Sequence, residues 1–282
     1  MIPARDLSLL ANRLAARGGR RLPEAVLERD YCIAWFLVAL SRTPLRERLA
    51  FKGGTALKRF YFADYRFSED LDFTLAIDST LDEIRRGLEP VFAEARAATG
   101  ALFRFAREDR HAHENSLTFY VAYEGPLPAP AGGREVKVDV TVRERLVLPL
   151  VDRPVLRGYA EYADLPEGAT VRTYSLGEIA AEKVVALTDR ARNEPRDLYD
   201  TWYLVSEAGV ALADLVEAVE LKWGFRGRTL RDVQEEFAAK EPRYRRLWTH
   251  RLASQMVALP EFDTVYRTVR RALRRAGLQA SA

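Results

Sequence analysis

The feature that most constrains this chain is a pair of adjacent glycines followed, after fifteen intervening residues, by two aspartates in an Asp-x-Asp pattern. Gly53 and Gly54, which precede Thr55, predict a sharp turn. In such a turn backbone N–H groups can approach phosphate oxygens, and the start of the next helix adds a favourable dipole. In a strand, the spacing of Asp70 and Asp72 puts both carboxylates on one face, which suits Mg²⁺. Together the two features predict nucleotide chemistry.

Length and composition indicate a soluble protein of the cytoplasm. The chain has 282 residues, which is enough for one large core or two modest ones. Its single cysteine, Cys32, excludes an intramolecular disulfide, and the apolar run at 31–40 is too short to cross a bilayer. The first residues lack the layout of a signal peptide. We therefore expect a cytoplasmic monomer without a membrane segment.

Basic charge is concentrated at the C-terminal end. Residues 241–282 contain nine arginines against three acidic residues, a net charge of +6, whereas the whole chain carries +3. In the segment 261–276, Val265, Val269 and Leu273 form one helical stripe. The arginines off this stripe are Arg267, Arg270, Arg271, Arg274 and Arg275. The pattern fits either a surface that follows an RNA backbone or the solvated face of an ordinary amphipathic helix.

Hydrophobic periodicity predicts an α+β fold, with a mixed sheet flanked by helices. Helices are expected at 22–41, 55–62 and 80–98, and strands at 48–52, 70–77, 101–107, 116–123 and 135–143. Residues 144–174, which contain several prolines and glycines, are expected to form a crossover or linker. We expect a bilobed protein, with an α+β lobe and its preceding helices over 1–155 and a mainly helical lobe over 156–282.

The strand expected at 135–143 adds a third candidate carboxylate. Valines alternate with polar residues along it, so Asp139 lies on the face opposite the valines. There it can complete a triad with Asp70 and Asp72, or it can be an ordinary solvated side chain on an edge strand. Three carboxylates beside a glycine turn suit a two-metal nucleotidyl transfer, in which one ion activates the attacking hydroxyl and the other holds the triphosphate.

The helical half offers a positive side chain for the phosphates. A helix is expected over 175–190, with Ser175 as its N-cap and Glu178 completing a capping box. Lys183 and Arg190 lie on one face of this helix, and both side chains are suited to phosphate. Alternatively, Lys183 is an ordinary solvated position. If it does bind phosphate, the site is a cleft between the two halves.

A second helix of this half is expected to begin after Pro195, which is tolerated in a first turn. Asp197 and Asp200 lie one turn apart on it. Further helices are expected at 211–222, 229–239, 243–258 and 261–276.

Taken in order, these blocks resemble the AbiEii/MenT toxins of type IV toxin–antitoxin systems, which belong to the polymerase-β-type nucleotidyltransferase superfamily. The strings that carry the resemblance are Lys52-Gly-Gly-Thr-Ala-Leu57, Arg66-Phe-Ser-Glu-Asp-Leu-Asp72, Glu182-Lys183 with Ala186-Leu187 and Arg190, and Arg196-Asp-Leu-Tyr-Asp200. The resemblance covers roughly residues 45–205 and implies a nucleotidyltransferase fold. It also implies an enzyme that uses Mg²⁺, or Mn²⁺, to transfer a nucleotide from an NTP to the 3′ end of tRNA, so that translation stops, and a cognate antitoxin.

The resemblance also implies roles for individual residues. Asp70 and Asp72 match the catalytic metal-binding pair, Asp139 fits the third metal carboxylate, and Lys183 matches an essential lysine that contacts the triphosphate. Either Asp197 or Asp200 carries a further essential acid. The residues expected to bind the nucleotide are Gly53, Gly54, Thr55, Lys183 and Arg190.

Ser68 is a candidate regulatory site because it lies two residues before Asp70. A phosphate there would add a charge of about −1.5 to −2 beside the metal pair and compete for Mg²⁺ or the NTP. Alternatively, Ser68 caps the turn into the strand.

Other functions are compatible with the same residues. The nucleotide acceptor can be a small molecule or a protein instead of RNA, and paired carboxylates also serve metal-dependent nucleases. A catalytically silent binding or antitoxin-like module would be expected to lack at least one of the three carboxylates, and this chain has all of them.

Overall fold

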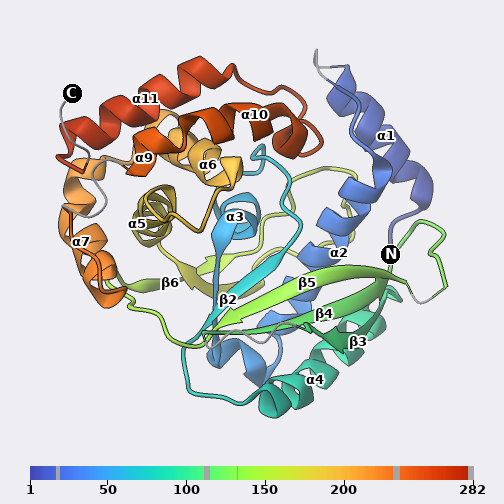
Figure 1. The fold of residues 1–282 in the computed structure, drawn as a ribbon. Coiled ribbons are helices and arrows are strands. Elements are labelled where there is room, and N and C mark those ends of the chain that lie inside the picture. Colours follow the sequence, from blue (N-terminus) through green and yellow to red (C-terminus); the bar gives the residue numbers. More distant parts are fainter. Residues whose placement is uncertain (17–19, 111–114, 132, 231–235, 279–282) are drawn as a thin grey trace. The chain divides into compact units, whose positions relative to one another are not determined.

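The computed structural model describes residues 1–16, 20–110, 115–131, 133–230 and 236–278 (Figure 1). The chain divides into two compact units. Unit 1 comprises Met1–Glu144, Leu150–Thr173 and Gln255–Val257, and unit 2 comprises Arg145–Pro149, Tyr174–Ser254 and Ala258–Ala282. Among the described residues, no helix combines the length and the apolar character that a membrane crossing requires.

Unit 1 is built on a seven-stranded sheet with the order β3-β4-β5-β2-β1-β7-β6. The strands are β1 (Leu49–Lys52), β2 (Leu71–Leu75), β3 (Leu102–Glu108), β4 (Ser116–Glu124), β5 (Arg134–Thr141), β6 (Leu150–Pro154) and β7 (Thr170–Tyr174). Strand β2 lies at the centre, antiparallel to β1 and parallel to β5. The sheet is therefore mixed, which confirms the predicted fold class.

The helices of unit 1 follow the predicted pattern with one addition, α1. They are α1 (Ala4–Ala15), α2 (Glu24–Ser41), the 3₁₀ turn η1 (Pro44–Glu47), α3 (Gly53–Ala56) and α4 (Leu81–Thr99). Helix α2 is buried around most of its circumference, so its sequence is apolar on nearly every face. Helix α4 begins at a capping box in which Thr80 and Glu83 bond to each other's backbone N–H groups.

The helix predicted at 55–62 differs from the structure in its start and its geometry. It begins two residues earlier, at Gly53, and its second half, η2 (Leu57–Tyr61), is a π-helix. The wider turn of the π-helix accompanies two fully buried cationic side chains, Lys58 and Arg59. Arg59 pairs with the buried carboxylate of Asp30 on α2.

The prediction that residues 144–174 form only a crossover or linker was wrong. Both β6 and β7 lie in this segment, and β7 pairs in parallel with β1. The hydroxyl of Thr173 donates to the carbonyl of Phe51 at 2.8 Å, and Val171 is completely buried. The prolines and glycines of the segment therefore flank two short strands instead of marking a linker.

Unit 2 is helical, as predicted. Its elements are α5 (Leu176–Leu187), α6 (Pro195–Ser206), the 3₁₀ turn η3 (Leu212–Leu215), α7 (Val216–Phe225), α9 (Glu236–Ala239), α10 (Glu241–Leu252) and α11 (Phe262–Arg275). Part of the helix predicted at 229–239 lies outside the described residues. The predicted apolar stripe of α11 is confirmed, because Val265, Val269 and Leu273 are all buried.

Helix α5 corrects two predictions. It ends at Leu187, not at Arg190, because the buried hydroxyl of Thr188 bonds to carbonyls of the last turn and accepts from Trp223. Ser175 is the N-cap, as predicted, but the Glu178 carboxylate does not complete a capping box. It accepts from the backbone N–H groups of residues 147 and 148 and lies 2.8 Å from Nζ of buried Lys222. Glu178 itself is fully buried.

Candidate functional site

The centre of the sheet brings two of the predicted carboxylates side by side. Strands β2 and β5 pair in a register that puts Asp72 directly opposite Asp139, and neighbouring strands are about 4.8 Å apart. Leu71 and Phe73, on the other face of β2, are buried, whereas Asp72 is half-buried. One face of the strand thus supplies core side chains and the other supplies the candidate site, as the alternation predicted.

The carboxylate of Asp139 has two hydrogen-bond partners. Thr118 on β4 donates to one oxygen at 3.2 Å, and Lys137 donates to the other at 3.3 Å. Burial lowers the pKa of the Lys137 ammonium, but the negative charges of Asp139, Asp70 and Asp72 outweigh burial, so that its pKa is raised. All three carboxylates therefore act on one lysine.

The three carboxylates do not form a finished metal centre. Among the described residues, no three His, Cys, Asp or Glu side chains are close enough together to hold a metal ion as they stand. Lys137 occupies one oxygen of Asp139. The assignment of Asp70, Asp72 and Asp139 as metal ligands stays a prediction.

Gly53 makes room for Asp72. Its φ angle is +78°, a conformation that glycine adopts without strain. A Cβ atom at this position would lie 2.4 Å from Oδ2 of Asp72. The glycine turn and the central aspartate therefore touch, and any larger residue at 53 would displace the carboxylate.

Gly54 makes room for a residue that sequence reasoning missed as part of the site, Arg66. A Cβ atom on Gly54 would lie 2.6 Å from a terminal nitrogen of the Arg66 guanidinium. Arg66 is only 3% exposed and donates to the carbonyl of Phe67 and to the side chain of Gln255. The signal in the sequence was an arginine placed between two aromatic residues, Tyr65 and Phe67, in the segment that leads to the aspartates.

The remaining predicted residues of unit 1 lie beside this turn. The hydroxyl of Thr55 donates to the carbonyl of Asp70 at 2.6 Å, which ties the start of α3 to the start of β2. Ser68 is only 8% exposed, and its hydroxyl would lie 3.2 Å from a Cβ atom on Gly54. Its regulatory role stays a prediction, and a modifying enzyme would need the segment around it to open.

In unit 2, the structure brings Lys183, Asp197 and Asp200 together. The lysine is 7% exposed, and its ammonium lies 2.7 Å from one oxygen of each aspartate. Helix α5 supplies the lysine and the first two turns of α6 supply the acids, which are neighbours at i and i+3. Lys183 is thus a buried, paired side chain rather than a solvated helix position.

Two basic residues missed from the sequence surround this cluster. Arg192 donates to both oxygens of Asp197, the shorter bond being 2.5 Å. Burial raises the pKa of the Asp197 carboxyl, but the charges of Lys183 and Arg192 outweigh burial and hold its pKa below the ordinary value. Lys240 is 5% exposed and donates to the carbonyls of Ala186 and Arg192. Arg192 lies between α5 and α6, and Lys240 lies 57 positions after Lys183, so helical periodicity linked neither of them to the cluster.

Arg190 lies apart from the buried cluster. It follows the end of α5, its side chain is 82% exposed, and it pairs with Glu236. It therefore does not share a helix face with Lys183, as the longer helix had predicted. Its assignment as a nucleotide-binding residue stays a prediction.

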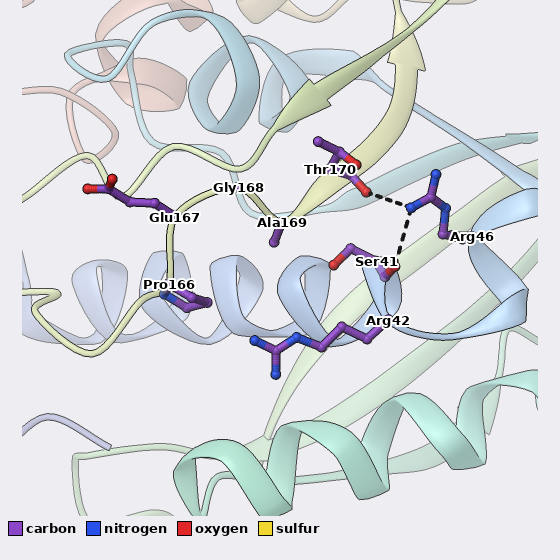
Figure 2. A pocket seen from close by; sticks show the side chains of 8 residues that line it. All are labelled: Ser41, Arg42, Arg46, Pro166, Glu167, Gly168, Ala169 and Thr170. Atoms are coloured by element: carbon purple, nitrogen blue, oxygen red, sulfur yellow. Dashed lines mark hydrogen bonds between the residues drawn. The ribbon is translucent and has the colours of Figure 1, made fainter.

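A separate pocket of about 330 Å³ lies between the end of α2 and the segment before β7 (Figure 2). Within it, Arg46 donates to the carbonyls of Ser41 and Thr170. None of the predicted site residues lines it. The lining residues are Ser41, Arg42, Arg46, Pro166, Glu167, Gly168, Ala169 and Thr170.

Solved structures with a similar fold include two bacterial proteins. MenT4, a nucleotidyltransferase toxin from Mycobacterium tuberculosis H37Rv, is 19% identical and matches over 95% of this chain and 89% of its own, with a TM-score of 0.65. JHP933 from Helicobacter pylori is 16% identical and matches over 90% of this chain and 93% of its own, with a TM-score of 0.53. At these identities the likeness shows a shared fold.

No curated protein matches the chain in sequence. A family does match: residues 35–268 fit the nucleotidyl transferase AbiEii toxin family of type IV toxin–antitoxin systems. This match includes the glycine turn, the carboxylates of the sheet and the Lys183 cluster. Because it spans most of the chain, the protein belongs to the AbiEii family and is a nucleotidyltransferase of the toxin type.

Proposed function

We propose that the protein transfers a nucleoside monophosphate from an NTP to the 3′ end of tRNA and thereby blocks translation. The observation that carries the proposal is the contact between the glycine turn and the central strand, where Gly53 leaves room for Asp72 and the register places Asp139 beside it. The family as a whole uses an NTP and a divalent metal. The RNA acceptor is supported by the resemblance and by the excess of arginine in residues 241–282.

The carboxylates near the centre of the sheet have the donor chemistry that suits a hard divalent cation, which we take to be Mg²⁺. Carboxylate oxygens are the ligands that Mg²⁺ prefers, and Gly53 leaves the Asp72 carboxylate a space that a Cβ atom would fill. Asp70, Asp72 and Asp139 would hold the ion. When bound, it would neutralise charge on the triphosphate and make the attacking hydroxyl a better nucleophile.

The other residues bind and orient the nucleotide. In our proposal, backbone N–H groups of Gly53, Gly54 and Thr55 donate hydrogen bonds to the triphosphate oxygens at the start of α3. Lys183 contacts the triphosphate as an ammonium group. Asp197 and Asp200 hold that ammonium in one position through bonds of 2.7 Å. Because both carboxylates bond to the Lys183 ammonium, each of them can fix its position.

Membership of the family implies a cognate antitoxin. We further propose that the protein acts in the cytoplasm as a monomer. Phosphorylation of Ser68 would place negative charge next to the Asp70–Asp72 segment and inhibit the enzyme.

The test is a transfer assay with each of the four labelled NTPs, Mg²⁺ and purified tRNA. Parallel reactions lack RNA, replace tRNA with tRNA that lacks its 3′-terminal residues, or use Asp72→Asn protein. The proposal expects label on intact tRNA from at least one NTP, release of pyrophosphate, and loss of both signals with the variant.

Other results would identify another acceptor or reject transfer. Label on the protein itself, or on small molecules of a cell extract, would move the acceptor away from RNA. Shortening of the tRNA without incorporation of label would indicate a nuclease. Label on tRNA that persists in Asp72→Asn would remove Asp72 from the site.

A further inference from the structure

The five arginines of α11 differ in how their side chains are satisfied. Arg267, Arg271 and Arg275 are exposed, whereas Arg270 and Arg274, one helical turn apart, are half-buried. The Nε atoms of Arg270 and Arg274 are shielded from water and have no hydrogen-bond partner. Buried N–H groups are nearly always bonded, so two such groups on one stripe of a helix require an explanation.

Neighbouring arginines on α10 and α11 do have carboxylate or carbonyl partners. Arg267 donates from Nε to the carbonyl of Asp263 at 3.0 Å, and Arg245 binds Asp263 and Glu241 at 2.7 and 3.0 Å. Within the described part of the chain, no carboxylate pairs with Arg270 or Arg274. Their guanidinium groups therefore retain the capacity to bind an oxyanion, the ligand that matches their planar donor geometry.

Buried tyrosines pack near the two arginines. Tyr266, one turn before Arg270, stacks on Phe237 with ring centroids 5.0 Å apart and is 3% exposed. Burial, together with the charge of Glu241, raises the pKa of Tyr266 to about 12, so its hydroxyl is protonated at neutral pH. The buried hydroxyl of Tyr244 on α10 has no hydrogen-bond partner either. The carboxylate of Glu241 acts on Tyr266 and accepts from Arg245 at 3.0 Å.

We propose that Arg270 and Arg274 form a binding site for a backbone phosphate of the RNA acceptor. The site rests on the proposed RNA acceptor and adds to it the residues of unit 2 that hold the RNA. RNA is favoured over a free anion because the segment that contains the pair carries a net charge of +6 from residue 241 onward, which suits a polyanion. Of the alternatives open for the arginine-rich helix, the structure assigns RNA contact to two of its five arginines.

The test compares two double variants that remove the same charge from the same helix. Arg270→Gln/Arg274→Gln removes the proposed site, and Arg271→Gln/Arg275→Gln removes two exposed arginines. Binding of deacylated tRNA is measured by fluorescence anisotropy from low to moderate salt, with thermal unfolding as a check on folding. The site variant should bind tRNA at least about 10-fold more weakly, with a salt dependence shallower by about one to two phosphate contacts. The control variant should change affinity less than about 3-fold.

Two further experiments distinguish the geometry of the arginine side chains from their charge, and RNA binding from NTP binding. Arg270→Lys/Arg274→Lys keeps the charge but lacks the planar guanidinium fork, so it should restore only part of the lost affinity. NTP binding, measured by the same method with a labelled nucleotide, should be unchanged in the site variant. Loss of NTP binding instead of tRNA binding would assign the pair to the triphosphate and overturn the proposal.

Equal weakening by the two glutamine variants would also overturn it, since it would show a general effect of charge. If neither glutamine variant alters tRNA binding while wild-type protein still labels tRNA, the phosphate site is wrong and the proposed function stands. If wild-type protein labels no tRNA, the proposed function is wrong. The difference between the matched variants in tRNA binding would still report on the site.

Discussion

The carboxylates on the sheet of unit 1 and the charged cluster of unit 2 differ in how far they are buried. On the sheet, Asp72 and Asp139 are half-buried neighbours, and the ammonium that contacts Asp139, Lys137, is itself 38% exposed. In unit 2, Lys183 is almost fully buried and is bonded to Asp197 and Asp200 at 2.7 Å each. The first group is open to solvent, whereas the second is closed, with its aspartates bonded to basic side chains.

This difference predicts that the carboxylates of the sheet contribute mainly to activity and the cluster of unit 2 mainly to stability. A half-exposed carboxylate keeps part of its hydration, so removal of one carboxylate on the sheet should alter activity more than folding. A buried ion pair has already lost its hydration, so removal of one partner leaves the other charged and unsolvated. Substitutions in the cluster of unit 2 should therefore lower the free energy of unfolding more than substitutions on the sheet do. The predictions that follow test this division.

The largest expected effect is on the stability of unit 2. Lys183→Met would leave Asp197 and Asp200 buried without their shared cation, and such breaks cost about 3–5 kcal/mol. The matched control is Lys137→Met, which removes a half-exposed ammonium from Asp139 and should cost about 1 kcal/mol or less. Urea unfolding followed by circular dichroism measures both. Equal losses of unfolding free energy in the two variants would show that burial does not distinguish the cluster of unit 2 from the carboxylates of the sheet.

The next effect is on catalysis by unit 1. Asp72→Asn keeps the size of the side chain but removes its charge, and nucleotide transfer should fall on the order of 10²–10³-fold, by analogy with the loss of other electrostatic groups at reacting centres. Its unfolding free energy should change by about 1 kcal/mol or less, because the side chain is half-exposed and keeps its size. Asp78→Asn, at an exposed position just beyond β2, serves as the control. A marked loss of stability in Asp72→Asn would show that Asp72 is structural.

A smaller effect tests how the glycine turn shapes the open group. Gly53→Ala imposes a left-handed φ on alanine and puts its Cβ 2.4 Å from Asp72, so it should cost about 1–3 kcal/mol and also lower activity. Gly100 has the same φ of +78° but no atom within 4 Å of its Cβ position. Gly100→Ala should therefore show the backbone strain alone and keep full activity. If both variants retain activity, the contact with Asp72 is irrelevant to catalysis.

Local patterns in the sequence predicted those parts of the structure whose causes are local. The alternation along β2 and β5 correctly placed Asp72 and Asp139 on the faces opposite the buried Leu71, Phe73 and valines, whereas Asp70 lies just before the start of β2. The pairing of β7 with β1 joins residues more than 110 positions apart, such as Phe51 and Thr173. No periodicity within five residues can show such a partner, and β6 and β7 were missed for this reason.

The same limit applies to the charged groups. The capping-box pattern at Ser175 correctly gave the start of α5, but Glu178 had a stronger partner in Lys222, which lies 44 positions away in the sequence. Arg66 was missed because its role depends on the absence of a side chain at Gly54, a contact that exists only in the folded chain. Sequence spacing thus selected the candidate side chains, and tertiary contacts decide how each is held.

The smallest expected effect compares one buried lysine from each unit under alkaline conditions. Lys58 in unit 1 donates to the hydroxyl of Tyr159, and Lys240 in unit 2 donates to two backbone carbonyls. Burial lowers the pKa of each lysine to about 8. Between pH 8 and 10.5 the unfolded chain retains protons that the folded chain has released, so stability rises with pH in that window. Below pH 8 both states are protonated and this contribution is flat.

Measured from pH 7 to 8.5, the unfolding free energy should therefore increase by less than any of the mutational effects above. The upper limit of pH avoids the tyrosines, since burial raises the pKa of Tyr159 and Tyr162 and reverses the trend once unfolded tyrosine ionises near pH 10. Lys58→Met should remove the rise from the unfolding of unit 1 and leave that of unit 2, and Lys240→Met should do the reverse. Amide hydrogen exchange resolves the two units in one experiment. A rise that survives in both variants would come from other groups. The two lysines would then be protonated in the folded protein, because the bonds of each ammonium to its oxygen partners would outweigh the cost of burying its charge.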